Sequence, residues 1–402
     1  MTDSYDVVVI GAGIQGAGVA QAAAAAGHRV LVLERTAVAA GTSSQSSKLI
    51  HGGLRYLETG QFRLVRESLR ERARLLEIAP ELVRLVPFYL PIYRHSQRKS
   101  WQVRCGLAMY QALGGFGEGT GFETVPQSEW HELDGLVTDD LVAVYRYDDG
   151  QTDDRLLTQA VIDSAVSLGA ELRMPAEFVA AKIHEDGCEV TYRDGEPRRS
   201  SAQSERTCRS AVLVNCAGPW ANELLSRVLP LQQTLEVDLV QGSHLWLSLD
   251  APGGVYYLEA PSDRRGVFAM PWYGEMLVGT TETLYDGPPD EARALPEEAS
   301  YLLDTLAYYF PQHRGVSDER IRKRYCGLRV LPKSGDRPFR RSREVIIHGD
   351  DPQCPRLVSV MGGKLTTYRL TAQRVMAQLA PQLPPPRQNR NTAQITLRIP
   401  TG

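Results

Sequence analysis

The sequence predicts an α/β fold with two sheets, and two observations lead to this prediction. An apolar run at 7–10, a glycine-rich turn, an alanine-rich segment and a second apolar run at 30–33 follow one another. This order is typical of a strand, a turn, a helix and a second parallel strand. Between residues 231 and 281, short apolar runs alternate with Gly, Pro and Asp turns, which is the composition of an antiparallel sheet. We therefore expect one domain for each sheet.

The first turn has the sequence GAGIQG at 11–16. Gly11 permits the tight turn, Gly13 lets the backbone approach a pyrophosphate, and Gly16 lets the helix pack closely on the sheet. Glu34 closes the second strand, where an acid accepts hydrogen bonds from ribose hydroxyls and repels a 2′-phosphate, so FAD or NAD is favoured over NADP. A strand–turn–helix unit without a nucleotide explains the glycines less well, because the acid also stands in the expected place.

Composition excludes several classes of function. The 402 residues suffice for two domains, and a formal net charge of −3 gives no electrostatic case for nucleic-acid binding. No apolar run approaches the ~18 residues of a spanning helix, and the N-terminus has no signal-peptide pattern. The six cysteines are scattered without metal-ligand spacing, so we expect no metal site and a cytoplasmic protein with reduced cysteines.

A polar loop at 41–47 runs directly into the sequence KLIHGGLRY at 48–56. Its hydroxyls and backbone N–H groups suit a phosphate or a flavin edge. A flexible serine-rich linker is the alternative, but a linker would not run into a Gly-Gly pair flanked by His51, Arg55 and Tyr56.

The remaining segments read as regular elements. Apolar spacing predicts an amphipathic helix at 61–80, then a strand at 87–91 and a basic segment around Trp101 that leads into a helix ending near Leu113. This basic segment suits either anionic lipid or solvent. Further predicted elements are a helix at 155–168 capped by Asp153 or Asp154, a strand at 170–174, a meander at 180–210, a buried strand from 211 that ends at Ala217 and Gly218, a helix at 297–310, a strand at 357–361 and a helix to about 379.

Seven short motifs stand in order along the chain: GAGIQGAG from 11, SSKLIHGGLRYLE at 46–58, NCAGPW at 215–220, QGSH at 241–244, GTTE at 279–282, GLR at 327–329 and GGKLTTYR at 362–369. Together they resemble the FAD-dependent glycerol-3-phosphate dehydrogenases, flavoproteins of the D-amino-acid-oxidase-like superfamily, over about residues 4–375. Three features depart from the family pattern. The chain lacks the usual helical C-terminal domain, Glu282 replaces an Asp, and Pro332 stands three residues after Arg329 instead of beside it.

The resemblance implies oxidation of sn-glycerol 3-phosphate to dihydroxyacetone phosphate, with hydride transfer to FAD. It implies that His244 in QGSH accepts the hydroxyl proton, because a neutral imidazole is available near pH 7. It also places Arg329 near the substrate and the flavin, where it would stabilise the developing alkoxide. Guanidinium groups match phosphate oxygens in two-pronged contacts. The candidate substrate-binding residues are Arg55, Tyr56, Arg341 and Lys364.

The cofactor is expected to be FAD, bound by residues from four parts of the chain. Thr366 and Thr367 begin the last helix, whose dipole would face the flavin edge where negative charge accumulates on reduction. The candidate FAD-binding residues are Gly11, Gly13, Gly16, Glu34, Thr42, Ser43, Ser47, Lys48, Leu49, His51, Gly52, Gly53, Ala217, Gly218, Gly363, Lys364, Leu365 and Thr366.

The fold expected from these observations is a discontinuous, Rossmann-like FAD-binding domain with a second, antiparallel-sheet substrate domain. The predicted ranges are 1–85, 146–231 and 322–380 for the FAD-binding domain, 86–145 and 232–321 for the substrate domain, and 381–402 for a disordered tail. The predicted partners are a small phosphorylated polyol, a quinone or another electron acceptor, the inner face of the cell membrane through a peripheral contact, and a second copy of the chain in a homodimer. Oxygen is left open as acceptor.

Two alternatives stay open. A related flavin oxidase or dehydrogenase could act on an amine or a 2-hydroxy acid. A carboxylate can be held by one arginine, whereas a phosphate needs more than one. A truncated, non-catalytic paralogue that binds FAD is the second alternative.

Overall fold

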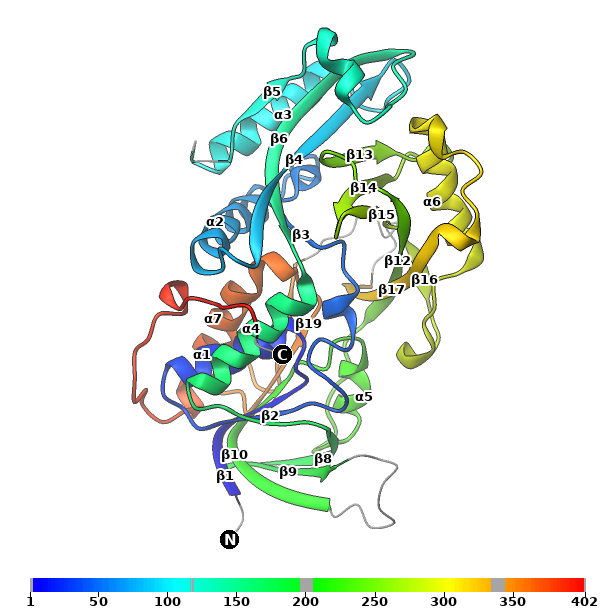
Figure 1. The fold of residues 1–402 in the computed structure, drawn as a ribbon. Helices are drawn as coiled ribbons and strands as arrows, with labels where there is room; N and C mark the ends of the chain where they lie inside the picture. Colours follow the sequence, from blue (N-terminus) through cyan, green and yellow to red (C-terminus); the bar gives the residue numbers. More distant parts are fainter. Residues whose placement is uncertain (1–2, 116, 118, 196–204, 334–343, 401–402) are drawn as a thin grey trace.

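The structure is a computed structural model that describes residues 3–115, 117, 119–195, 205–333 and 344–400. In this part of the chain the strands form two sheets, one of nine strands and one of ten. Figure 1 shows the nine-stranded sheet around β1, β2, β8 and β10, and the ten-stranded sheet around β4, β6 and β12 to β17. The predicted α/β class with two sheets is confirmed.

The nine-stranded sheet is assembled from three separate stretches of the chain. Its centre is parallel, with β1 between β10 and β2, β7 beside β2, and β19 beside the second half of β10. Val7, Val8 and Val9 are fully buried, as expected of a strand covered on both faces. The strands are β1 (Asp3–Ile10), β2 (Val30–Leu33), β7 (Glu171–Arg173), β8 (Ala176–His184), β9 (Gly187–Asp194), β10 (Glu205–Asn215), β11 (Val228–Leu229), β18 (Ile346–Gly349) and β19 (Leu357–Met361).

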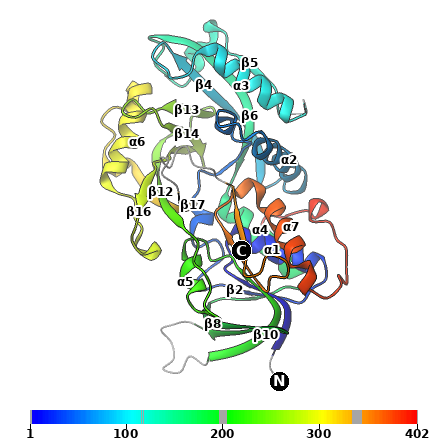
Figure 2. The same ribbon diagram turned by 180° about the vertical axis from the view of Figure 1, so that it is seen from behind.

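Helices α1 (Ile14–Ala25), α4 (Asp154–Ser167) and α7 (Tyr368–Leu379) cover one face of this sheet. They lie side by side in both ribbon views (Figures 1 and 2). Small residues make this packing close: a Cβ on Gly18 would lie 2.7 Å from the ring of Tyr368. The antiparallel part of the sheet, formed by β8, β9 and the first half of β10, packs over the other face of the parallel strands. Phe178 and Tyr192 belong to the apolar core between these two parts.

The ten-stranded sheet is antiparallel except for the parallel pair of β4 and β13. Instead of only short strands, it contains β12, which spans 14 residues and pairs with β15, β16 and β17. The strands are β3 (Leu49–Ile50), β4 (Val83–Tyr93), β5 (Phe122–Thr124), β6 (Leu141–Thr152), β12 (Val237–Asp250), β13 (Val255–Glu259), β14 (Gly266–Trp272), β15 (Glu275–Gly279), β16 (Thr283–Tyr285) and β17 (Ile321–Pro332).

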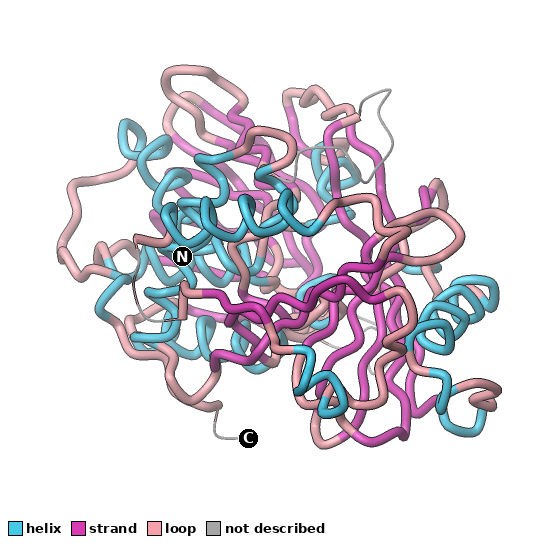
Figure 3. Tube along the Cα trace, turned by 90° about the horizontal axis from the view of Figure 1, so that it is seen from above, coloured by secondary structure: helices cyan, strands magenta, loops and turns pink. Residues whose placement is uncertain are grey.

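Four further helices complete the fold. Helix α6 (Pro296–Tyr309) packs Leu302 and Leu306 against β12 and β15, and helices α2 (Phe62–Ile78) and α3 (Ser100–Leu113) cover β4 and β6. The short helix α5 (Ala221–Leu225) follows β10. Figure 3 shows helices on two opposite sides of the molecule with strands running between them. No helix within the described ranges has the length and apolar character needed to cross a bilayer.

Most predicted elements agree with the structure to within a few residues. Asp153 caps α4, because its carboxylate accepts hydrogen bonds from the backbone N–H groups of Arg155 and Leu156. The five predicted ranges of the two domains stay a prediction. Strands β4, β6 and β17 cross three of the predicted boundaries, at 85/86, 145/146 and 321/322, and all three belong to the ten-stranded sheet.

The C-terminal segment departs from the prediction of a disordered tail. Its backbone N–H groups at Gln388 and Arg390 donate to carbonyls at the end of α1, and that of Leu397 donates to Ile78 of α2 at 2.7 Å. Leu397 is 1% exposed and belongs to the apolar core around α1. The described residues 381–400 thus pack against α1 and α2 and correct the prediction of disorder.

Candidate functional site

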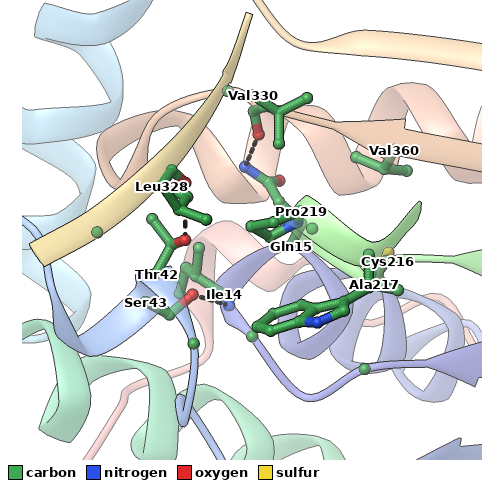
Figure 4. A pocket seen from close by; sticks show the side chains of 18 of the residues that line it. Ile14, Gln15, Thr42, Ser43, Cys216, Ala217, Pro219, Leu328, Val330 and Val360 are labelled. Carbon is green, nitrogen blue, oxygen red and sulfur yellow. Dashed lines mark hydrogen bonds between the residues drawn. The ribbon is translucent and has the colours of Figure 1, made fainter. Parts of the chain in front are cut away.

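A pocket of about 590 Å³ lies between the two sheets and is lined by residues of both. Its volume is in the range of small-molecule and cofactor sites. The nine-stranded sheet contributes the turns that follow the carboxyl ends of β1, β10 and β19, where open α/β sheets bind ligands. The ten-stranded sheet contributes Leu328 and Val330 of β17 (Figure 4).

The turn between β1 and α1 has no room for side chains. Gly11 has a φ of +97°, and a Cβ there would lie 2.7 Å from the carbonyl oxygen of Cys216. A Cβ on Gly16 would lie 1.9 Å from the carbonyl oxygen of Gly11. Helix α1 begins after Gly13 without a side-chain cap of its own and with no acidic residue in its first turn. Backbone N–H groups and the positive end of the helix dipole are therefore presented to an anion in the pocket.

Two oxygen-bearing side chains complete this cradle. Ser43 Oγ accepts a hydrogen bond from the N–H of Ile14 at 2.9 Å, so a hydroxyl stands at the helix N-terminus (Figure 4). The carboxylate of Glu34 accepts from the N–H groups of Ala12 and Thr36, both at 2.8 Å. These bonds orient Glu34 at the end of β2 and leave lone pairs for further donors such as ribose hydroxyls. The donor set fits a dinucleotide such as FAD.

The turn after β19 approaches the same helix. Gly362 and Gly363 have φ values of +70° and +83°, and a Cβ on Gly363 would lie 2.8 Å from Nε2 of Gln15. The short helix η9 (Leu365–Thr367) follows and leads into α7. Thr366 Oγ1 accepts from the backbone N–H of His51 at 3.3 Å, which ties the GGKLTT turn to the loop that follows β3.

Hydrogen bonds to β17 and to α4 hold the polar loop at 41–47 and the following Lys48 in place. Thr42 Oγ1 donates to the carbonyl of Leu328 at 2.8 Å (Figure 4). The buried ammonium of Lys48 donates to the carboxylate of Asp154 and to the carbonyl of Ser44, both at 2.6 Å. Lys48 therefore directs its charge toward α4, and it does not line the pocket.

His244 lies on β12 between Gly279 of β15 and Tyr325 of β17. A Cβ on Gly279 would lie 2.2 Å from the imidazole, whose other neighbour is the Tyr325 ring, stacked at a centroid distance of 5.0 Å. The side chain is 1% exposed, and its Nε2 lies 2.9 Å from Ser47 Oγ. Nδ1 has no hydrogen bond of ordinary geometry within the described part of the chain.

The electrostatics of this position keep the imidazole neutral. Burial lowers the pKa of His244 well below its usual value, and the positive charges of Arg329 and Lys48 lower it further. The backbone at Gly242 acts in the opposite direction but does not reverse the shift. A neutral imidazole can accept a proton at pH 7.

Arg329 of β17 pairs with Val240 of β12, its guanidinium lies over Gly242, and it lines the pocket. Its Nη2 donates to Thr280 Oγ1 at 3.0 Å, and its Nη1 lies 3.5 Å from a carboxylate oxygen of Glu282. A Cβ on Gly242 would lie 2.8 Å from Nη2, so glycine is required for this guanidinium position. Glu282, which replaces the usual Asp, reaches the arginine.

Lys364 and Tyr56 meet at the pocket wall. The Lys364 ammonium lies 4.1 Å from the Tyr56 ring centroid and donates to Ser68 Oγ at 3.1 Å. The Arg55 guanidinium lies 5.5 Å from the same ring but does not line the pocket. Lys364 and Arg329 are thus two of the cationic side chains that line the pocket.

The pocket brings together most of the sequence-predicted site residues. Those that line it are Gly11, Gly13, Glu34, Thr42, Ser43, Ser47, Leu49, His51, Tyr56, Ala217, Gly218, Arg329, Gly363, Lys364, Leu365 and Thr366. Those that do not line it are Gly16, Lys48, Gly52, Gly53, Arg55 and His244. Arg341 lies outside the described residues. The individual roles assigned to these residues stay predictions.

Sequence reasoning missed a buried carboxylate, Glu298, that organises the ten-stranded sheet beside the pocket. Glu298 of α6 accepts hydrogen bonds from Gln241 and Ser243 of β12, from Thr281 and Thr283, and from the backbone N–H of Leu295, at 2.6 to 3.1 Å. Burial alone would raise the pKa of Glu298, but these donors lower it. The Pro-Glu-Glu start of α6 predicts a capped helix, and nothing local in the sequence reveals the partners on other strands.

Comparison with known proteins gives concordant matches. The profile of the family described as FAD dependent oxidoreductase matches residues 6–373. A D-erythritol 1-phosphate dehydrogenase from Brucella abortus is 35% identical over 379 residues, which are 94% of this chain and 74% of that protein. A glycerol-3-phosphate dehydrogenase from Pseudomonas aeruginosa is 35% identical over 390 residues, 95% of this chain and 72% of that protein. The crystal structure of the glycerol-3-phosphate dehydrogenase from Bacillus halodurans, complexed with FAD, superposes with a TM-score of 0.73 at 25% identity, covering 98% of this chain and 68% of that one.

Proposed function

Because the chain belongs to the family of FAD dependent oxidoreductases, we propose that it binds FAD in this pocket and oxidises the secondary hydroxyl of sn-glycerol 3-phosphate to the ketone of dihydroxyacetone phosphate. One observation carries the proposal. The same pocket joins a glycine turn and Glu34, which suit a dinucleotide, to Arg329 and Lys364, which suit a phosphate ester.

The chain's own side chains have separate tasks in this reaction. When bound, FAD takes up the hydride from the carbinol carbon. Lys364 offers a point charge to the phosphate at the pocket wall, with Tyr56 beside it. Arg329, held by Thr280, stabilises negative charge that develops on the substrate oxygen. The neutral imidazole of His244 is the final acceptor of the hydroxyl proton.

D-erythritol 1-phosphate is a second candidate substrate. The relative with that activity is as similar to this chain as the glycerol-3-phosphate dehydrogenase is, each at 35% identity. Both substrates are phosphate esters of a polyol with a secondary hydroxyl, so the charges at Arg329 and Lys364 serve either one. The two substrates differ in chain length, and the bleaching test compares them directly.

The substrate test is anaerobic bleaching of the flavin absorbance of the purified protein. We expect bleaching by sn-glycerol 3-phosphate or by D-erythritol 1-phosphate, because each supplies both the phosphate and the secondary hydroxyl. Glycerol and a D-amino acid serve as controls, since neither places a phosphate against the cationic wall. Bleaching by the amino acid alone would support the amine-oxidising alternative, and no bleaching by any compound would support a non-catalytic FAD-binding protein.

The electron acceptor is proposed to be a membrane quinone, reached through a peripheral membrane contact. Helix α3 supports this proposal, because Trp101 and Met109 are 67% and 43% exposed on one face with Cys105, Ala108 and Ala112. Lys99 and Arg104 stand at the start of this helix, an arrangement suited to an anionic bilayer surface. Figure 1 shows α3 at the top of the molecule, beyond α2.

Co-sedimentation with vesicles tests this contact. We expect binding to vesicles that contain anionic lipid and weaker binding after Trp101→Ser with Met109→Ser, because the exposed apolar face of α3 is then lost. Equal binding of both proteins, or binding of neither, would remove α3 as the contact. Sedimentation velocity tests the proposed homodimer.

A further inference from the structure

Ser47 separates the pocket from the imidazole of His244. Ser47 lines the pocket, whereas His244 is 1% exposed and does not line it. Ser47 Oγ lies 2.9 Å from His244 Nε2, a hydrogen-bond distance. We infer that Ser47 relays the substrate's hydroxyl proton to His244, so that Ser47 is the catalytic residue that touches the substrate oxygen. This inference rests on the proposed function and adds a group to it.

The proposed transfer is balanced in atoms and charge. The substrate O–H bond breaks as Ser47 Oγ takes its proton, and the original Ser47 proton passes to His244 Nε2. Ser47 ends as it began, while His244 becomes positively charged. The C–H electron pair leaves as hydride to FAD, and the C–O bond becomes the carbonyl. The relay requires an imidazole that carries its single proton on Nδ1, so that Nε2 can accept from Ser47.

One buried carboxylate anchors the chain on both sides of Ser47. Asp154 accepts from the backbone N–H and the hydroxyl of Ser46, at 3.0 and 2.6 Å, and from the ammonium of Lys48 at 2.6 Å. Asp154 is fully buried at the start of α4, where the helix dipole favours negative charge. Asp154 and Lys48 are therefore positioning residues that hold the Ser47 hydroxyl against His244.

The charges around His244 set the conditions for the relay. Strand β17 contributes Arg329 and the neutral phenol of Tyr325, with the Lys323 ammonium 5.7 Å from the centroid of that ring, and the 41–48 loop contributes Lys48. Strand β15 contributes the backbone of Gly279. Two cations thus oppose a charged imidazole until the dianionic substrate binds in the pocket. Substrate binding should therefore raise the proton affinity of His244.

The test compares Ser47→Ala with Ser47→Thr, which retains the hydroxyl. In anaerobic mixing with sn-glycerol 3-phosphate, we expect Ser47→Ala to slow flavin bleaching about 100-fold and Ser47→Thr to stay within about 10-fold of wild type. In the double variant with His244→Ala, the losses should not multiply, because the two residues act as a unit. Multiplying losses, or an unimpaired Ser47→Ala variant, would overturn the inference.

A spectroscopic readout makes the test independent of turnover. With ¹⁵N-histidine labelling and the His244 signals assigned by their loss in His244→Ala, wild type should show the Nδ1–H tautomer. Ser47→Ala should shift the Nε2 resonance, whereas Ser47→Thr should leave it near its wild-type position. An Nε2–H tautomer in wild type would contradict the relay. A flavin-loaded wild type that no phosphorylated polyol bleaches would overturn the proposed function as well, whereas fast bleaching by wild type and Ser47→Ala alike would overturn the relay alone.

Discussion

The two sheets build their shares of the pocket by different means. The nine-stranded sheet uses backbone: Gly11, Gly13 and Gly363 remove side chains so that N–H groups and turns face the ligand. The ten-stranded sheet uses side chains such as that of Arg329, which Thr280 and Glu282 hold in place. We therefore expect an added atom to disrupt the glycine turns, and the loss of a hydrogen-bonding group to displace the side chains of the ten-stranded sheet.

Adding a methyl group to the glycine turn should have the largest effect. In Gly16→Ala the new Cβ would lie 1.9 Å from the carbonyl oxygen of Gly11, so the turn itself must shift. We expect at least about 3 kcal/mol of destabilisation and loss of bound flavin, measured by denaturant unfolding and by absorbance. Gly106→Ala in α3 is the matched control, because its Cβ meets only Leu54 at 3.9 Å. Flavin retention by Gly16→Ala would contradict the claim that the nine-stranded sheet binds its ligand through turns without room for side chains.

Removing the imidazole of the substrate side should spare the cofactor. His244→Ala should slow anaerobic flavin bleaching about 10²- to 10⁴-fold, the usual contribution of a general base. Flavin content should stay at the wild-type level, since His244 does not line the pocket. His348→Ala is the control, because His348 lies on the exposed side of β18. A flavin-free His244→Ala protein would show that flavin binding depends on the ten-stranded sheet as well.

The Glu298 network should make a smaller and pH-dependent contribution. Glu298→Gln replaces one of the two acceptor oxygens with an NH2 donor that faces two of the four side-chain partners, which should cost about 2–4 kcal/mol and weaken substrate binding before flavin binding. The folded-state pKa of Glu298 is lowered, so its stabilisation is present above the ordinary carboxyl value of about 4.3 and is lost as the pH falls through the folded value. The exposed neighbour Glu297 provides the control Glu297→Gln. Equal unfolding curves for both variants would show that the hydrogen bonds of Glu298 do not stabilise the fold.

The protonation of His244 should have the mildest effect, seen in the pH dependence of kcat/KM and of stability. Because the pKa of His244 is lowered from about 6.5, kcat/KM should be flat from about pH 6.5 upward through neutrality and fall only at lower pH. Stability should follow the same sign: the neutral buried imidazole contributes fully above about pH 6.5 and loses its contribution as the pH falls. A kcat/KM profile that still rises between pH 7 and 8 would contradict the lowered pKa.

The same contrast explains how much the sequence could predict. The nucleotide side was predictable because consecutive residues carry it: Gly11 to Gly16 and Glu34 form one strand–turn–helix–strand unit. His244 and Arg329 were proposed only through motifs of a known family, since their strands meet by pairing between distant segments. Ser47 reads as a cofactor contact in sequence, and only the folded chain shows its hydroxyl against His244. The tail at 381–400 was misjudged because its partners, Ala25 and Ile78, lie far away in sequence.

Arg329→Ala tests the central claim most directly, because Arg329 belongs to the substrate half and lines the shared pocket. The measurement is a pair of titrations, FAD into apoprotein and sn-glycerol 3-phosphate into the anaerobic holoprotein. We expect FAD affinity within about 2-fold of wild type and a loss of substrate affinity of about 10- to 100-fold, the value of hydrogen bonds to a charged group. Loss of FAD affinity, or unchanged substrate affinity, would contradict the division of the pocket between the two sheets.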